Sequence, residues 1–488
     1  MAKDEYPDLD KISKIIDNPA FQQRQVEHRE IPILNSKEEW IEWLNKSYAC
    51  ITINGKFKIL HEKPNGEIEF MDKKDFISSL ENRRVMVTSP EDGKSKYLPV
   101  TEMWLKGARR EYMGIIFDPS RIGHYNGLYN LWKGYKILGV SGDCSIFLDY
   151  VKEIMCNNNE RDFNYLVALI AQMFQQPWAK PGIAVVIRGD EGVGKSFFIE
   201  KLGTLMDGYY FKTSNPQYIF GDHNGQLKNV VLLHLEEAVW AGSKKDESLL
   251  KDLITGRTIQ INDKFMPVIS VPNHLHLFIT GNPEWLVSAG FKARRLFALH
   301  AITSHIRDTK YFAELDQWFN NGGSGALIDY FINYKGDIDL RIVPNTDELM
   351  EQKQQSMYGV IEWIYSIVDS KEMPYGDYNK SDDHIRVIKK LMLLDYNHSP
   401  SGRRHQLSDR KFGIQFTDIL TDVLTDNIKI KDSREVRRDG YEIPDNKSCR
   451  KMIETMLGGK CKWTTPDGHW TVLKGNTDFD FSLYKPDK

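Results

Sequence analysis

The chain has 488 residues, of which 65 are Lys or Arg and 68 are Asp or Glu, so its formal net charge is −3. A hydrophobic fraction of 41% is ample for packed cores, and the length suggests about three domains of roughly 150 residues each. The charge balance excludes a basic nucleic-acid wrapper and an acidic disordered chain. Any contact with a nucleic acid must therefore be local.

The cysteines and the N-terminal residues indicate a protein of a reducing compartment. The five cysteines are scattered and never stand in CxxC spacing, which argues against a disulfide framework or a zinc ribbon. The gaps between Cys449, Cys461 and His469 fit no familiar metal-ligand spacing, so we expect packing residues there. There is no signal-peptide core and no window near the roughly 18 apolar residues of a membrane span. We expect a cytoplasmic protein with no membrane partner.

Changes in composition divide the chain into segments of different character. We expect a charged tail or docking arm at 1–30, an α+β module at 31–144, a helical segment at 145–181, an α/β core at 182–305, a helical extension at 306–343 and a mixed C-terminal accessory module at 344–488. Strand-like runs alternate with helical patterns in the core, as in a parallel sheet flanked by helices. In the C-terminal module basic pairs interleave with acidic residues, so a winged-helix-like DNA-binding module and a solvated surface both stay open.

Aromatic residues gather near the end of the α+β module. They are Trp104, Tyr112, Phe117, Tyr125, Tyr129, Trp132 and Tyr135. A compact aromatic core is the more common arrangement of such residues. A base-stacking platform is the alternative, although nothing in the sequence places the rings on one exposed face.

The strongest motif is a complete GxxxxGK[ST] phosphate loop, formed by Gly189, Asp190, Glu191, Gly192, Val193, Gly194, Lys195 and Ser196. An apolar run at 183–187 precedes it and a helical pattern at 196–206 follows it, which is the strand–loop–helix context that this motif requires. The glycines let backbone N–H groups surround phosphates at a helix N-terminus. We expect Lys195 to reach the β- and γ-phosphates and the Ser196 hydroxyl to bind Mg²⁺. The motif predicts a nucleoside-triphosphate site.

Two further strand-like runs end in polar residues. The run at 230–235 ends in Glu236 and Glu237, and we assign Glu236 to the metal and Glu237 to the base that polarises the attacking water. The run at 275–280 is followed by Asn282, whose amide can orient that water or touch the γ-phosphate. A solvated acidic turn and an ordinary turn asparagine are the alternatives.

Two arginines follow this series. Arg294 and Arg295 stand just before an apolar run at 296–299. An arginine there could neutralise the charge that develops on the γ-phosphate. Surface arginines at the start of a strand are the alternative.

The order and close spacing of these elements resemble the superfamily 3 helicases, a branch of the AAA+ ATPases. The resemblance is carried by GDEGVGKS at 189–196, LEE at 235–237, LITG at 253–256 with Lys264, ITGN at 279–282 and RR at 294–295. More narrowly, the chain is similar to the helicase part of phage and plasmid primase–helicases of the poxvirus type, with supporting stretches at 109–119, 129–135 and 344–352. It departs from that pattern in having Glu236 where many ATPases have Asp, and in lacking a convincing primase metal triad.

The resemblance implies an AAA+-like core that hydrolyses ATP with Mg²⁺ between the subunits of a homo-hexameric ring. Such a ring moves along single-stranded DNA and unwinds duplex during replication of a phage, plasmid or other mobile element, in the host cytoplasm if it is phage-encoded. One of the two arginines would act from the neighbouring subunit. Priming would come from a separate primase or replication protein.

The resemblance also assigns a task to the hairpin expected at 258–271. In such rings this hairpin projects into the central channel, so Lys264 is the first candidate for a DNA phosphate contact, with Phe265 as a stacking neighbour and Arg257 as a weaker candidate. An exposed turn lysine is the alternative. One basic side chain repeated by symmetry would hold a strand without a basic protein surface, which reconciles DNA binding with the near-neutral charge.

Two other functions are compatible with a phosphate loop. One is a nucleotide-gated DNA-binding initiator or assembly ATPase that does not unwind, although a site that only binds nucleotide has no need of a base such as Glu237. The other is a small-molecule kinase, for which the chain is longer than necessary.

Overall fold

The computed structural model describes residues 31–479 except 32–33, 54, 65, 89–92, 94, 108, 216, 222–223, 238–243, 263–267, 285, 288–292, 380, 382 and 426–427. The tail expected at 1–30 lies outside the described residues. The chain divides into two compact units, Met1–Gly134 and Tyr135–Lys488, whereas composition placed the end of the α+β module at 144. Residues after 134 belong to the second unit because the Tyr135 hydroxyl donates to the carbonyl of Phe174 at 2.8 Å and the Val140 N–H donates to that of Gly325 at 3.1 Å.

The first unit is a small α+β module. Its main sheet has the order β3-β2-β1-β6. The strands are β1 (Tyr48–Ile53), β2 (Lys56–Glu62), β3 (Ile68–Met71) and β6 (Glu111–Tyr112), the two-stranded pairs are β4 (Arg84–Thr88) with β5 (Ser95–Pro99) and β7 (Gly114–Ile116) with β8 (Leu128–Asn130), and the helices are α3 (Lys37–Ser47), α4 (Lys73–Ser79) and α5 (Val100–Gly107). Apolar residues of α3, α4 and α5 share one core with residues of β1 and β2.

The aromatic cluster of this unit is mostly core. Trp104, Tyr112, Tyr129 and Trp132 are buried. Tyr125 is exposed, and the guanidinium of Arg121 lies 4.4 Å from its ring centre. Because four of the six rings in this unit are buried, they contribute to packing rather than to an open stacking platform.

The second unit is built on a five-stranded sheet in the order β10-β11-β14-β9-β15. All its pairings are parallel. The strands are β9 (Ala184–Arg188), β10 (Tyr210–Thr213), β11 (Leu232–Glu236), β14 (His276–Gly281) and β15 (Leu296–His300). Since β14 lies between β9 and β11, the carboxyl ends of these three strands are neighbours at one edge of the sheet.

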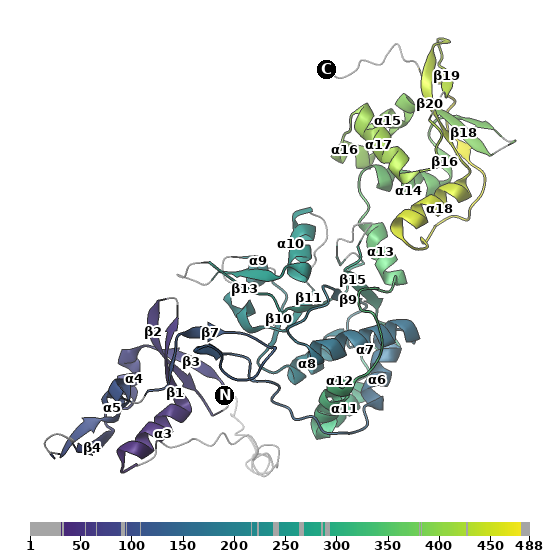
Figure 1. The fold of residues 1–488 in the computed structure, drawn as a ribbon. Helices are drawn as coiled ribbons and strands as arrows, with labels where there is room; N and C mark the ends of the chain where they lie inside the picture. Colours follow the sequence, from purple (N-terminus) through teal and green to yellow (C-terminus); the bar gives the residue numbers. More distant parts are fainter. Residues whose placement is uncertain are drawn as a thin grey trace, which may run out of the picture. The chain divides into compact units, whose positions relative to one another are not determined.

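Helices cover both faces of this sheet (Figure 1), as strand runs without polar alternation require. They are α6 (Ser145–Tyr150) with the π-helix η1 (Val151–Met155), α7 (Glu160–Gln175), α8 (Lys195–Leu205), α9 (Gln217–Phe220), the 3₁₀-helix η2 (Gly225–Asn229), α10 (Lys244–Thr255), α11 (Thr309–Trp318) with the π-helix η3 (Phe319–Gly323), α12 (Ser324–Asn333) and α13 (Asp347–Gln355). On one face Leu235 and Ile279 pack with Leu253 of α10. On the other, Phe297 meets the Tyr165 ring of α7 with 4.8 Å between ring centres.

Two helical stretches of this unit are interrupted. The helical segment expected at 145–181 begins with α6, which is continued by the π-helical turn η1. The extension is two helices, α11 and α12, separated at Gly322, whose φ of 109° no ordinary helix can contain.

The C-terminal part of the second unit packs helices on a second sheet. Its sheet has the order β17-β18-β20-β19, with the short pair β16-β21 beside it. The elements are α14 (Val360–Ser370), β16 (Glu372–Met373), β17 (Asp377–Asn379), β18 (His384–Ile388), α15 (Lys389–His398), α16 (Pro400–Arg404), α17 (Asp409–Ile419), β19 (Lys429–Lys431), β20 (Arg437–Ile443), α18 (Asn446–Leu457) and β21 (Thr471–Val472). Trp363, Tyr396 and Phe412 are central to its core. Among the described helices of the whole chain, none has both the length and the apolarity needed to cross a membrane.

Candidate nucleotide-binding site

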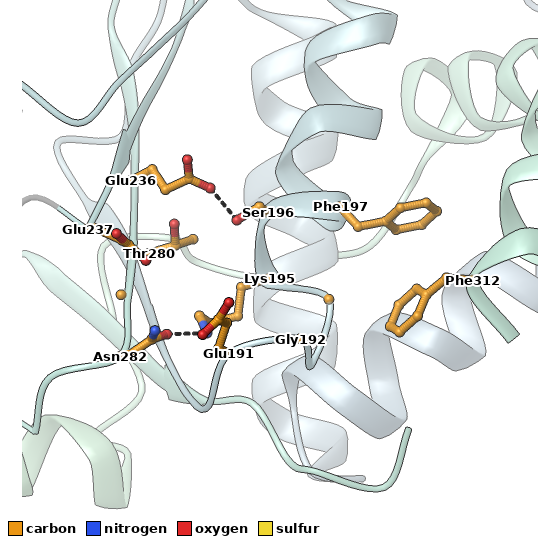
Figure 2. Close-up of a pocket in the computed structure, with 12 residues that line it drawn as sticks. Glu191, Gly192, Lys195, Ser196, Phe197, Glu236, Glu237, Thr280, Asn282 and Phe312 are labelled. Atoms are coloured by element: carbon orange, nitrogen blue, oxygen red, sulfur yellow. Dashed lines mark hydrogen bonds between the residues drawn. The ribbon is translucent and has the colours of Figure 1, made fainter. Parts of the chain in front are cut away.

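A pocket of about 260 Å³ opens at the carboxyl edge of the core sheet (Figure 2). It is lined by the phosphate loop after β9, the acidic pair at the end of β11, the residues that end and follow β14, and one residue of α11, Phe312. The strand order explains this gathering, because β14 places Asn282 between the phosphate loop and the acidic pair.

The phosphate loop joins β9 to α8 and depends on its glycines. Gly194 is the N-cap of α8 and has a φ of 98°, which disfavours any other residue. A Cβ on Gly194 would also lie 2.6 Å from the Phe312 ring, and one on Gly189 would lie 2.8 Å from the Ala301 carbonyl oxygen. The Tyr150 hydroxyl donates to the Gly194 carbonyl at 2.8 Å. Other segments of the same chain therefore pack tightly around the loop.

Lys195 is buried and all three of its ammonium hydrogens have acceptors. Its Nζ donates to the carbonyls of Gly189 and Asp190, each at 2.7 Å, and to Oδ1 of Asn282 at 2.8 Å. Burial lowers the pKa of Lys195, while the carboxylates of Asp190 and Glu237 act in the opposite direction. The lysine and the asparagine thus meet at the same end of the pocket.

Glu236 lies between a hydroxyl and an ammonium group. The Ser196 hydroxyl donates to its Oε1, and Lys212 Nζ lies 2.7 Å from its Oε2. Burial alone would raise the pKa of Glu236, but the hydrogen bonds from Lys212 and Ser196 and the Lys212 charge lower it overall. The carboxylate is therefore ionised near neutral pH, as a metal ligand must be.

The Ser196 hydroxyl and the Glu236 carboxylate are oxygen donors of the kind that Mg²⁺ takes beside substrate phosphates. Across the ranges that the structure describes, no group of three or more His, Cys, Asp or Glu side chains could hold a metal ion. The donor set fits a magnesium ion that completes its coordination with nucleotide phosphates and water.

All five cysteines are free thiols, and only Cys461 is not buried.

Glu237 has an unusual backbone. Its φ is 52°, in the left-handed region, and its N–H donates to the Thr280 carbonyl at 2.7 Å. This conformation costs about 1 kcal/mol or more for a residue with a side chain, and such strain is typical of functional sites. The bond to β14 holds Glu237 at the pocket, where its exposed side chain forms part of the wall.

A neutral histidine lies under the acidic pair. His234 is fully buried, with Nδ1 3.1 Å from the Tyr210 hydroxyl and Nε2 2.8 Å from Thr280 Oγ1. Burial lowers its pKa to about 4. It joins β10, β11 and β14 below the pocket and does not line it.

Arg294 and Arg295 do not line the pocket of their own chain. They precede β15, and the Arg295 carbonyl accepts from the Ala184 N–H at 2.8 Å, at the amino end of β9. The phosphate loop begins at the other end of β9, about 16 Å away for a five-residue strand. Arg294 is exposed and Arg295 is half-buried.

The predicted DNA contacts fall largely outside the described residues. Lys264 and Phe265 are among residues 263–267, which the structure does not describe. The arms of their hairpin are β12 (Thr258–Ile261) and β13 (Ile269–Pro272), which pair antiparallel. Arg257 is exposed just before β12.

Sequence reasoning missed Lys212, Phe312 and a polar network around α13. Arg188, the last residue of β9, donates from Nε to both carboxylate oxygens of Glu348, at 2.8 and 2.9 Å. Gln352 Oε1 accepts from the N–H groups of Leu286 and Val287, at 2.9 and 3.1 Å. The i,i+4 spacing of Glu348 and Gln352 marks one face of a helix, but nothing in the sequence names their partners.

Comparison with known proteins bears on the fold. A family model described as a family of unknown function, DUF5906, matches residues 187–295, from within β9 to Arg295. No curated protein matches the chain. Three solved apo structures of the C-terminal region of NrS-1 match with TM-scores of 0.52, 0.53 and 0.52, at 17%, 16% and 16% identity, covering 88%, 87% and 88% of this chain and 92%, 91% and 93% of that chain. The chain is similar to that region in fold. At such identity the likeness says nothing about activity.

Proposed function

We propose that the chain is an ATPase and ring helicase of the superfamily 3 type that unwinds DNA during replication of a phage, plasmid or mobile element. The observation that carries the proposal is the convergence of Lys195, Glu236, Glu237 and Asn282 on one pocket beside the phosphate loop. A site that only holds a nucleotide needs neither the second carboxylate nor the amide at the lysine.

In this proposal the phosphate loop binds the β-phosphate through its backbone N–H groups. A phosphate oxygen that enters the pocket competes for one of the three hydrogen bonds of Lys195. Asn282 accepts one of these bonds, so it is within reach of the γ-phosphate. Ser196 and Glu236 would hold Mg²⁺, which when bound neutralises part of the phosphate charge.

Glu237 is the proposed general base. The oxygen of a water molecule attacks the γ-phosphorus, the bond from that phosphorus to the β,γ-bridging oxygen breaks, and the proton of the water goes to the Glu237 carboxylate. Asn282 would hold the same water through its amide. The Lys212 ammonium group pairs with Glu236 and not with the base Glu237. Its Nζ lies between the carboxylates of Glu236 and Glu200, at 2.7 Å from each.

The arginine that completes the site would come from a second copy of the chain. Arg294 and Arg295 lie at the opposite edge of the sheet from the pocket, so neither can serve the phosphates of its own subunit without a large rearrangement. A head-to-tail ring, a homo-hexamer by the resemblance, would present the arginine edge of one subunit to the pocket edge of the next.

Single-stranded DNA would contact the hairpin of β12 and β13 through Lys264, with Phe265 and Arg257 beside it. The C-terminal module is a candidate for a winged-helix-like DNA contact, since Arg410 and Lys411 are exposed on α17. A separate primase or replication protein would supply primers.

The test compares the wild type with Glu237→Gln, which keeps the size of the side chain and removes its basicity. ATP hydrolysis is measured with and without single-stranded DNA, and strand separation is measured on a forked duplex. We expect DNA-stimulated hydrolysis with unwinding in the wild type and a loss of both, by about a hundredfold or more, in the variant. If single-stranded DNA does not stimulate hydrolysis and the forked duplex is not separated, the assembly ATPase replaces the helicase as the proposed function.

A further inference from the structure

The pocket has two chemically different ends. Figure 2 shows Glu236, Glu237 and Asn282 at one end, and the rings of Phe197 and Phe312 at the other, beyond the phosphate loop. If the γ-phosphate lies with Lys195 and Asn282, the chain of phosphates crosses the loop and the nucleoside leaves toward the aromatic end. The following inference rests on the proposed function, because it takes the pocket to be a nucleotide site.

Phe312 is held at that end by close contacts with the loop itself. It is on the first turn of α11, and its ring lies 5.4 Å from that of Phe197 in an edge-to-face arrangement. The segment that leads to Phe312 packs along the loop. Ala301 lies against Gly189, Arg307 against Gly192 and Phe312 against Gly194. The Arg307 N–H donates to the Gly192 carbonyl at 3.2 Å. The position of the Phe312 ring is therefore tied to that of the bound phosphates.

We propose that Phe312, with Phe197 beside it, is the contact for the nucleotide base and that the contact is apolar. The described residues that line this end are Gly192, Gly194, Phe197 and Phe312, none of which offers a polar side-chain atom to a base edge. A π-face packs against adenine and guanine alike. The site therefore binds nucleotides through their phosphates and the stacked base, without choosing between adenine and guanine.

The test measures binding of ADP, GDP and inorganic pyrophosphate, each with Mg²⁺, to the full chain by calorimetry, since none of these is hydrolysed further at the site. For the wild type we expect ADP and GDP to bind within about fivefold of each other, because stacking does not read the base edge. Phe312→Ala should weaken ADP and GDP by about tenfold each and leave pyrophosphate unchanged. Phe312→Trp should restore both nucleotides. Phe57→Ala, the same change at a partly exposed ring of the first unit, is the matched control and should alter nothing.

Two results would overturn the inference. One is an equal effect of Phe312→Ala on pyrophosphate and on ADP, and the other is a preference for ADP over GDP of a hundredfold or more. Lys195→Ala separates the inference from the function on which it rests: if it leaves the binding of all three ligands unchanged, the pocket is not a phosphate site at all. Should Phe312→Ala fail to fold, photolabelling of the wild type with 8-azido-ADP decides. We expect the label within 301–312 or at the start of α8, and a label elsewhere refutes the assignment.

Discussion

The side chain of Asn282 shows how much of this site depends on single residues. It is exposed at the end of β14, yet its Oδ1 accepts one of the three hydrogen bonds of a buried lysine. It carries no charge, so it can contact both the Lys195 ammonium and a phosphate-bound water without repelling either. An aspartate there would neutralise the lysine that the phosphates need.

Asn282→Ala should therefore lower kcat for ATP hydrolysis by about a hundredfold, the usual cost of removing one polar group that orients or stabilises the reacting atoms. The KM for ATP and the Tm should change little, because the loop still binds the phosphates and the side chain is exposed. Steady-state kinetics measure kcat and KM, and thermal unfolding measures the Tm. Asn320→Ala, at an exposed position of η3 in the same unit, is the control. An unchanged kcat would remove Asn282 from the mechanism.

The buried histidines link stability to pH. Burial lowers the pKa of His234 and of His276 from the ordinary 6.5 to about 4. Between these pH values each histidine binds a proton in the unfolded chain but not in the folded chain. The contribution of the two histidines to stability is therefore complete above pH 6.5 and is lost as the pH falls toward 4.

We expect His234→Gln to reduce the loss of stability between pH 7.5 and pH 5 by about 2 kcal/mol. Glutamine can keep the hydrogen bond to Thr280 but does not titrate. Urea unfolding at the two pH values measures the difference, and it is insensitive to any constant loss of stability in the variant. The exposed His405→Gln is the control, and a wild-type pH dependence in His234→Gln would show that folding leaves the pKa of His234 unchanged.

At the scale of elements, α13 connects two parts of the candidate site that are distant in sequence. Glu348 binds the last residue of β9, directly before the phosphate loop, and Gln352 binds the backbone that follows Asn282. The Glu348 side chain is 2% exposed and that of Arg188 is 12% exposed, so the pair is shielded from water. Any movement of α13 would move both sides of the pocket.

Arg188→Met should destabilise the protein by about 3 kcal/mol, because it leaves a buried carboxylate without its main partner. Adding Glu348→Gln to that variant should recover part of the loss, since the remaining group is then neutral. Arg341→Met removes an exposed ion pair with Asp339 and should cost far less stability than the change at the buried arginine. Chemical denaturation measures the free energy of unfolding of all three variants. An equal loss for Arg188→Met and Arg341→Met would show that the buried ion pair contributes no more stability than the exposed one.

At the scale of the whole molecule, the proposed mechanism requires assembly, because the arginines lie at the opposite edge of the sheet from the pocket. Arg294→Ala and Arg295→Ala should each be tested for loss of hydrolysis with retained ADP binding. The variant that meets both conditions is then mixed with Glu237→Gln. Some interfaces of a mixed ring pair a wild-type carboxylate with a wild-type arginine, so two inactive proteins should regain a measurable part of the ATPase activity. Light scattering confirms the mixed assembly, and mixed rings without any recovered activity would indicate that the arginine does not act between subunits.

The sequence by itself predicted the residues on which the proposed chemistry rests. It placed the phosphate loop between a strand and a helix, and it placed Glu236 and Asn282 at the ends of buried strands. These features could be predicted because apolar runs and turn residues are local signals. The local pairing of β12 with β13 follows from the same kind of pattern.

Only the tertiary structure decided which of these strands are neighbours. The insertion of β14 between β9 and β11 brings Asn282 to Lys195, and it depends on long-range packing that no local pattern encodes. Lys212, Phe312 and the Arg188–Glu348 pair are likewise visible only when the chain is folded, since each acts on a residue far away in sequence. A side chain's type sets what it can bind, but its partner is set by the packing of the whole chain.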